Sequence, residues 1–237
     1  MKAIYTAILC AMLPALAFGG GAINFDGTDD HMTVPVSIGS TFTLSIWFKR
    51  SVLADNHTLF GGVSSKYSAN INTHVDGMIG MATSRSDNYD AFGNTGLAWN
   101  HFVAAVSGTS KKLYLNGVMG VDEITPLPDA DNNYYIGRRN DGYRFNGLVG
   151  TVSVYAVALT PEEVSCLYSG TLGPPKVKRG LVSSWSMENN GISTGNPHPN
   201  GSTIKDSVGS NDGTIADGVD SSMALTSSPL RKKRGRR

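Results

Sequence analysis

The sequence predicts an all-β protein, an antiparallel sandwich of two sheets with one short helix towards the C-terminal end of its body. Of its 237 residues, 28 are glycine and only 16% are charged. Several segments alternate apolar and polar residues with the period of two that a half-buried strand requires. Turn dipeptides such as Asn116–Gly117 separate these segments. Short strands joined by tight turns account for these observations better than a helical bundle does.

The first residues, MKAIYTAILCAMLPALAFGG, have the three-part pattern of a secretory signal peptide. Lys2 provides a positive start, Ala3 to Leu16 is mostly apolar, and Ala15-Leu16-Ala17 is a small-x-small cleavage signal. We expect residues 1–17 to be removed, which leaves Phe18 as the first mature residue of a secreted or extracellular protein. The alternative is an apolar N-terminal element of a cytosolic or virion protein.

The strongest strand signals lie in the first two thirds of the chain. In FTLSIWF the apolar Phe42, Leu44, Ile46 and Phe48 share one face. Similar alternation predicts strands in HFVAAVS (101–107), KLYLNGV (112–118) and LVGTVSVY (148–155), and weaker signals predict HTLFGG (57–62), MIGMAT (78–83) and YYIG (134–137). Asn116–Gly117 predicts a tight hairpin, and Asp26–Gly27, Asp141–Gly142 and Asn146–Gly147 predict further turns.

One helix is predicted in LTPEEVSCLYSG. Thr160 is a capping residue, and Pro161 suits the first helical position. Glu162 and Glu163 favour the positive end of the helix dipole, and Gly170 can end the helix.

Three segments together resemble the laminin-G-like domain of the concanavalin A-like lectin and glucanase family. They are AINFDGTDDHMTVP with FTLSIWFKR, then LAWNHFVAAVSGTSKKLYLNGV, then YYIGRRNDGYRFNGLVGTVSVYAVALTPEEVSCLYSG. The resemblance implies a jelly-roll domain over residues 22–173 that contacts a glycan or a surface protein. It also implies calcium at a rim. One departure stands out, since Gly150 and Thr151 occupy positions where such domains commonly carry acidic residues.

The rest of the chain divides into three parts. Residues 174–180 read as a linker that is rich in proline and basic residues. Residues 181–227 resemble the opening of a second, incomplete laminin-G-like unit, which we expect to dock on the first domain because Val182, Trp185 and Ile215 would otherwise be exposed. Residues 228–237 form a basic tail, expected to be disordered, that would attract polyanions.

The charge of the chain is unevenly spread. The last seven residues hold six basic groups, which leaves 14 of the 20 basic residues against 19 acidic ones in the body. A mildly acidic body does not suit nucleic-acid binding.

The stretch NFDGTDDHMTVP, residues 24–35, allows two interpretations. It can be a plain hairpin that turns at Asp26–Gly27 between two strands. It can also be a calcium contact through Asp26 or Asp30, because calcium prefers oxygen ligands. Adjacent residues of a strand point to opposite faces, so we do not expect Asp29 and Asp30 to form one tight cage. A second acidic stretch from Asp129 lacks the glycine and glutamate of a calcium-binding loop and is expected to be solvated.

The loop RRNDGYRF has the aromatic and polar composition of a carbohydrate-binding surface. Arg139, Asn140, Asp141 and Tyr143 are the candidate sugar contacts, although the same residues also fit an ordinary polar hairpin loop.

We expect no catalysis. Glycosidases of this fold carry paired carboxylates on one strand, and no ExDxxE run occurs. No GxSxG elbow is present, and the five histidines lack metal-ligand spacing. The favoured hypothesis is a secreted, non-catalytic module for carbohydrate binding or adhesion. The alternatives are a structural or receptor-contact protein of a viral particle or surface assembly and, as a third hypothesis, a glycan-cleaving enzyme.

Overall fold

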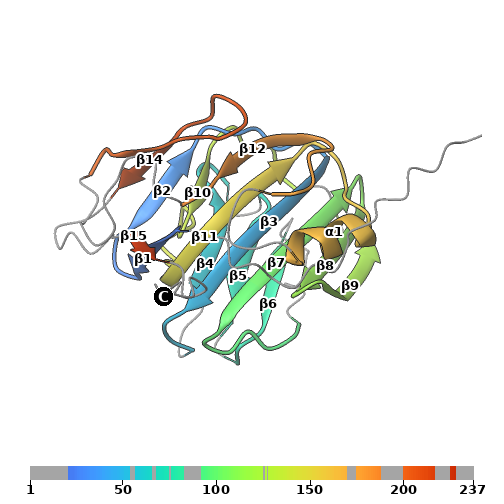
Figure 1. Ribbon diagram of the computed structural model, residues 1–237, viewed down its shortest axis with the longest axis horizontal. Helices are drawn as coiled ribbons and strands as arrows, with labels where there is room; N and C mark the ends of the chain where they lie inside the picture. The colour runs from blue at the N-terminus through green and yellow to red at the C-terminus, as the bar shows by residue number, and fades with distance from the viewer. Residues whose placement is uncertain are drawn as a thin grey trace, which may run out of the picture.

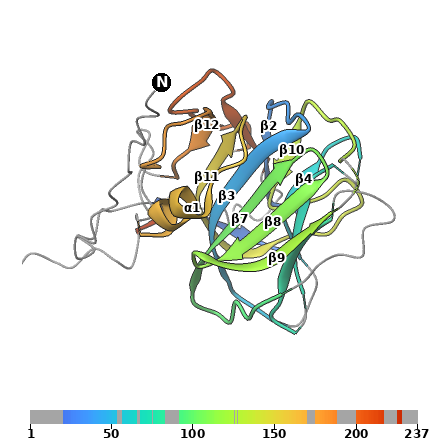
Figure 2. The same cartoon turned by 90° about the vertical axis from the view of Figure 1, so that its right-hand side faces the viewer.

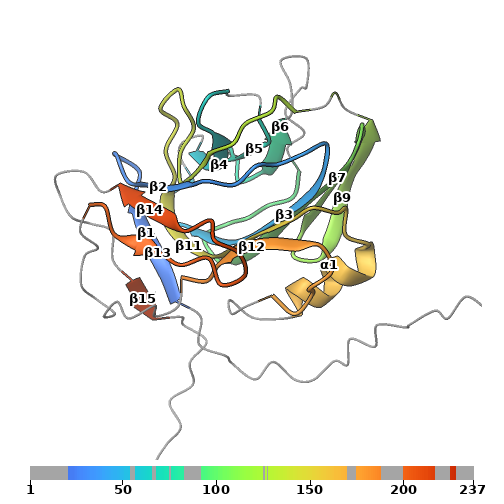
Figure 3. The same ribbon diagram turned by 90° about the horizontal axis from the view of Figure 1, so that it is seen from above.

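The computed structural model describes residues 21–53, 57–65, 68–74, 76–82, 92–124, 126, 128–169, 175–187, 200–216 and 225–227. These residues form two antiparallel sheets that lie face to face, with one helix outside them (Figure 3). The predicted all-β sandwich with a single short helix is therefore confirmed. The predicted signal peptide and the basic tail lie outside the described residues. No helix within the described part of the chain is long and apolar enough to span a membrane.

The first sheet, sheet A, lies beneath the helix. Its strand order is β15 (Leu225–Ser227), β1 (Gly21–Asp26), β11 (Asn146–Tyr155), β3 (Thr41–Arg50), β7 (Trp99–Ser107), β8 (Ser110–Leu115) and β9 (Val118–Ile124). Figure 2 shows β3, β7, β8 and β9 side by side, with β9 at the edge. The predicted Asn116–Gly117 hairpin joins β8 to β9, and both residues have the positive φ angles, 53° and 77°, that this turn demands.

The second sheet, sheet B, covers the other side of the core. Its strand order is β13 (Thr203–Ile204), β14 (Gly213–Ala216), β2 (His31–Val34), β10 (Tyr134–Ile136), β4 (His57–Gly62), β5 (Asn70–Thr73) and β6 (Ile79–Ala82). Alternation of side chains places Met32, Tyr134 and Ile136 in the core between the sheets.

The core follows the predicted period of two. Leu44, Ile46 and Phe48 on β3 are fully buried between the sheets. The opposite face of β3 carries Ser45 and Trp47 towards the helix side. Each buried side chain of this size contributes about 1.5–3 kcal/mol, so the stacked inner rows provide most of the cohesion of the fold.

The helix α1 (Pro161–Tyr168) starts where the sequence predicts. The Thr160 hydroxyl accepts a hydrogen bond from the Glu163 backbone N–H, and the Glu163 carboxylate accepts one from the Thr160 N–H. This reciprocal capping box satisfies two backbone donors that the first helical turn leaves open. Val164 and Leu167 then pack on the outer face of sheet A in a second, smaller apolar cluster.

Two of the predicted turns do not reverse the chain within one sheet. Asp26–Gly27 follows β1 in sheet A, and the next strand, β2, lies in sheet B, so the expected hairpin is wrong. Asn146 and Gly147 are the first residues of β11 rather than a turn. Gly147 is required there for a steric reason, because a Cβ atom would lie 2.2 Å from the Lys49 carbonyl oxygen.

Residues beyond 180 contribute strands to both sheets. β12 (Leu181–Trp185) pairs with Val152–Tyr155 of β11, on the edge whose other half, Asn146–Val149, pairs with β1. In sheet B, β14 pairs with β2. Figure 1 shows both additions, with β12 beside β11 and β14 beside β2. Between these two halves of β11, the pairing with β3 shifts register at Gly150 and Thr151. These are the two positions where laminin-G-like domains commonly carry acidic residues.

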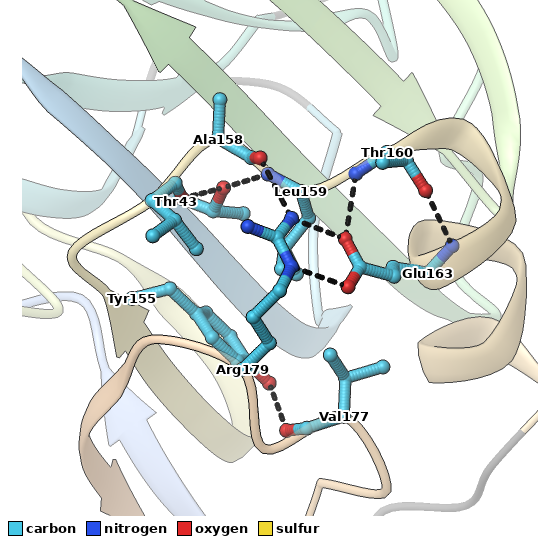
Figure 4. A network of polar contacts seen from close by, with 9 residues as sticks. Thr43, Tyr155, Ala158, Leu159, Thr160, Glu163, Val177 and Arg179 are labelled. Carbon is cyan, nitrogen blue, oxygen red and sulfur yellow. Dashed lines mark hydrogen bonds and ion pairs between the residues drawn. The ribbon is translucent and has the colours of Figure 1, made fainter. Parts of the chain in front are cut away.

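A polar network holds the predicted linker against α1 (Figure 4). Arg179 donates to both carboxylate oxygens of Glu163, at 2.7 and 2.5 Å, and to the Ala158 carbonyl oxygen at 3.0 Å. The Tyr155 hydroxyl donates to the Val177 carbonyl oxygen. The arginine lowers the pKa of the Glu163 carboxyl through these hydrogen bonds, so the carboxylate stays charged although it is almost completely buried.

The same C-terminal segment supplies core residues. The Trp185 side chain is fully buried, and its Nε1 donates to the Asn211 carbonyl oxygen at 2.7 Å. Asp206 accepts hydrogen bonds from the backbone N–H groups of Ser184 and Val208. A buried carboxylate that organises a loop in this way ties the segment to β12.

Candidate functional site

Two connections cross from one sheet to the other at the same end of the sandwich. Because β1 pairs with β11 and β2 pairs with β10, the connections β1–β2 and β10–β11 must run side by side. A hydrogen bond of 2.8 Å from Asn146 Nδ2 to the Asp26 carbonyl oxygen ties them together. We call residues 26–31 and 137–145 the crossing rim.

The acidic turn of the crossing rim brings three carboxylates together. Oxygen atoms of Asp26, Asp29 and Asp30 lie within 4.8 Å of one another. Asp26 Oδ1 accepts from the Thr28 N–H at 2.7 Å, and Asp30 Oδ2 accepts from the Asp26 N–H at 2.9 Å. The expectation that Asp29 and Asp30 diverge is wrong, because residues 27–29 form a bend in which strand alternation does not apply.

This group has the chemistry of a hard-cation site. All three side chains present oxygen, the ligand that calcium prefers. Asp29 Oδ1 is buried and has no hydrogen-bond partner among the described residues. Asp26, Asp29 and Asp30 would hold the ion, which would supply positive charge at the rim.

The predicted sugar contacts lie in the other half of the crossing rim. Arg139 forms a two-point ion pair with Asp141, at 2.6 and 2.9 Å, and its guanidinium lies 4.4 Å from the centre of the Tyr143 ring. The Arg139 N–H donates to the Tyr143 carbonyl oxygen. Three of the four predicted residues therefore form one pre-organised unit. The Tyr143 side chain keeps 46% of its surface exposed.

The fourth predicted residue, Asn140, reaches a neighbouring loop. Its Nδ2 donates to the Ser64 carbonyl oxygen at 3.3 Å. Asp131 braces that loop by accepting from the backbone N–H groups of Ser64 and Ser65, at 2.7 and 3.3 Å. Asp131 is only 5% exposed, so the expectation of a solvated loop is wrong at this residue.

Four further residues of this end of the sandwich were not among the sequence-predicted contacts. Arg138 and Arg144 face each other across an isolated bridge, and the Arg138 guanidinium lies 4.7 Å from the centre of the Tyr135 ring. His31 meets the same ring edge-on, with 5.0 Å between the ring centres. His31 and Tyr135 come from separate strands, so only the register of β2 and β10 brings them together.

His31 is held neutral. Its Nδ1 donates to the Asp29 carbonyl oxygen at 3.0 Å, since a carbonyl can only accept. Burial lowers the pKa of His31 most, and the charges of Arg138 and Arg144 lower it further. The hydrogen bond to Asp29 and the Asp29 charge act in the opposite direction without reversing the result.

One serine–histidine pair occurs elsewhere, on the outer face of sheet A. Ser45 Oγ and His101 Nε2 are 2.8 Å apart, and His101 stacks on Trp47 beneath Tyr168 of α1. His101 Nδ1 has no partner within the described part of the chain, so the carboxylate of a catalytic triad is not in place there. Burial lowers the pKa of His101 to about 3.

The family model described as "Concanavalin A-like lectin/glucanases superfamily" matches residues 26–165. A proposed carbohydrate-binding protein from Bacteroides ovatus superposes with a TM-score of 0.66 at 20% identity, over 89% of this chain and 60% of that protein. This chain thus spans less than two thirds of the length of that protein.

Two other solved structures share the fold. A heptameric pentraxin from Limulus polyphemus gives a TM-score of 0.54 at 17% identity, over 68% of this chain and 88% of the pentraxin. A Trypanosoma rangeli sialidase in complex with the inhibitor DANA gives 0.51 at 17% identity, over 63% of this chain and 28% of the sialidase. No curated protein matches this chain in sequence.

Proposed function

Since this chain belongs to the concanavalin A-like lectin/glucanase superfamily, we propose that it is a secreted module that binds carbohydrate, or mediates adhesion through it, without cleaving it. The crossing rim is its binding surface. The observation that carries the proposal is the exposed Tyr143 ring, held in place by the Arg139–Asp141 ion pair. A fixed ring can stack on the apolar face of a sugar while amides and guanidinium groups bind the hydroxyls.

Pre-organisation favours binding because the loop loses little freedom when a ligand arrives. Gly142, with φ at +94°, lets the loop turn tightly enough for Arg139 to meet both Asp141 and Tyr143. Asn140 is anchored on Ser64 at the same time. These contacts are made within the free protein, and Tyr143 stays 46% exposed.

A glycan array tests the proposal, with the wild type compared with Tyr143→Ala. We expect the wild type to bind a restricted set of glycans and Tyr143→Ala to lose about two- to twelvefold in affinity, because stacking on one aromatic ring contributes about 0.5–1.5 kcal/mol. Tyr168→Ala removes a tyrosine of similar exposure, 41%, from the helix side and is the matched control. Thermal melting shows that each variant folds. Absence of binding to every glycan would overturn the proposal.

The non-catalytic part of the proposal has its own test. The proposal is supported by the sequence, in which no ExDxxE run of paired carboxylates occurs. Incubation with each bound glycan should release no new reducing ends. Detectable release would favour the hydrolase alternative instead.

The location of the protein is tested at its N-terminus. Residues 1–17 have the pattern of a signal peptide, and removal would leave Phe18 first. Mass spectrometry of protein recovered from its source should find Phe18 as the first residue. Retention of Met1 would instead favour the particle or surface-assembly alternative.

A further inference from the structure

We propose that the crossing rim selects an anionic sugar, one that carries a carboxylate or a sulfate, and that Arg138 and Arg144 bind the charged group. This inference rests on the proposed function and adds the class of glycan to it.

The two arginines have no carboxylate partner. Neither Arg138 nor Arg144 forms an ion pair with any acidic side chain that the structure describes, whereas neighbouring Arg139 is paired with Asp141. Charged groups in folded proteins are usually neutralised when they are partly buried, and both arginines are half-buried. Two adjacent half-buried cations without a counter-ion therefore form a binding site for an anion.

The geometry of each guanidinium leaves donors available. The Arg138 guanidinium lies over the Tyr135 ring, 4.7 Å from its centre, and a guanidinium in this position can still donate hydrogen bonds through its edge. Among the described residues, its side chain makes one hydrogen bond, from Nε to the Arg139 carbonyl oxygen at 3.4 Å. Arg144 Nε is buried and has no hydrogen-bond acceptor among the described groups. A carboxylate or a sulfate group has two oxygen atoms that can accept parallel hydrogen bonds from one guanidinium.

The backbone places the two side chains on the same short hairpin. Arg138 and Arg144 occupy opposite positions of its bridge, so their side chains leave from neighbouring points on one face. Tyr143 is adjacent in sequence to Arg144 and 46% exposed. The arginine pair therefore lies on the same hairpin as Tyr143, within the crossing rim.

The surrounding charges do not cancel this preference. Asp141 is already paired with Arg139, and Arg138 and Arg144 lie on the β10–β11 half of the crossing rim, whereas the three aspartates lie on the β1–β2 half. The rim therefore has an acidic end suited to a cation and a basic end suited to an anion.

The test uses the full chain on an array that presents each backbone sugar in neutral, carboxylated and sulfated forms. We expect the charged forms to bind at least tenfold more tightly than their neutral counterparts, because hydrogen bonds to charged groups are among the strongest in proteins. Comparison of carboxylate with sulfate then distinguishes the two sources of charge. Equal or tighter binding of the neutral forms overturns the inference but leaves the proposed function intact. Absence of binding to any form overturns both.

Substitutions locate the anion. On the best-bound charged glycan, Arg138→Gln and Arg144→Gln should each weaken binding by about tenfold or more. Arg144→Lys keeps the positive charge but loses the planar guanidinium that can donate two parallel hydrogen bonds. Its affinity should lie between those of Arg144→Gln and the wild type. Lys176→Gln removes an exposed positive charge from the linker and should leave affinity within about twofold. The basic tail is present in every variant, so unchanged affinity in both arginine variants would assign the anion to the tail and refute the inference.

Discussion

Protonation of one buried histidine should make the protein sensitive to mild acid. His101 is 1% exposed and lies between Ser45 on one side and the stacked rings of Trp47 and Tyr168. A second proton on the ring would require an acceptor for Nδ1, and none exists among the described residues. The charged form is therefore strongly disfavoured in the folded protein, and burial lowers the pKa of His101 from 6.5 to about 3.

The sign and size of the effect follow from linkage. The unfolded chain takes up a proton near pH 6.5 and the folded protein near pH 3, so the stabilising contribution is complete above pH 6.5 and is lost as the pH falls towards 3. One pKa unit corresponds to about 1.4 kcal/mol. Between pH 7 and pH 5, His101 alone should lower the free energy of unfolding by about 2 kcal/mol.

Urea unfolding of the wild type and of His101→Gln at the two pH values measures this loss. Glutamine fits a similar space and cannot be protonated, so the variant should lose about 2 kcal/mol less than the wild type between pH 7 and pH 5. His74→Gln tests whether the effect belongs to His101, because burial also lowers the pKa of His74, which is only half-buried. If His101→Gln loses as much stability as the wild type over this interval, the assignment of acid sensitivity to His101 is refuted.

Three further predictions concern the stability of the folded protein. Trp185→Ala should lower the free energy of unfolding by about 3–5 kcal/mol in urea titrations, because a fully buried ring is lost, whereas Val208→Ala in the same segment removes a 44% exposed side chain and should cost less than about 0.5 kcal/mol. Calcium should raise the melting temperature of the wild type, with a gain of about 2.7 kcal/mol at a hundred times its dissociation constant, and Asp29→Asn should abolish most of that rise; a wild type indifferent to calcium would contradict the cation site. Gly147→Ala should destabilise by about 2 kcal/mol or more through its clash with a backbone oxygen, and an equal effect of Gly39→Ala, which has open space around it, would argue against that cause.

Local signals in the sequence predicted the elements whose determinants are local. Alternation in Thr41–Arg50 requires only that one face be apolar, and the structure buries that face. The capping residues of α1 lie within four positions of one another, so the start of the helix could be read directly. In contrast, β5 (Asn70–Thr73) has a single large apolar residue, Ile71, and carries too weak a pattern to be recognised.

Features that depend on which strands pair could not be predicted from local sequence patterns. An Asp-Gly pair marks a turn, but whether the chain returns to the same sheet or crosses to the other depends on distant pairings. Asp26–Gly27 crosses because β1 pairs with residues around Asn146, some 120 positions away. The same limit applies to the site. Arg139, Asp141 and Tyr143 are close in sequence and were predicted together, whereas the approach of His31 to Tyr135 depends on the register between β2 and β10.

The most direct test of glycan binding at the crossing rim is to map a bound glycan on the protein by nuclear magnetic resonance. The backbone amide signals of the isotope-labelled chain are recorded during titration with the best charged glycan from the array. If the glycan binds at the crossing rim, the largest shift changes should fall in residues 137–145 and at His31, with little change in α1. Changes concentrated in α1 or along β9, with the crossing rim unaffected, would contradict it.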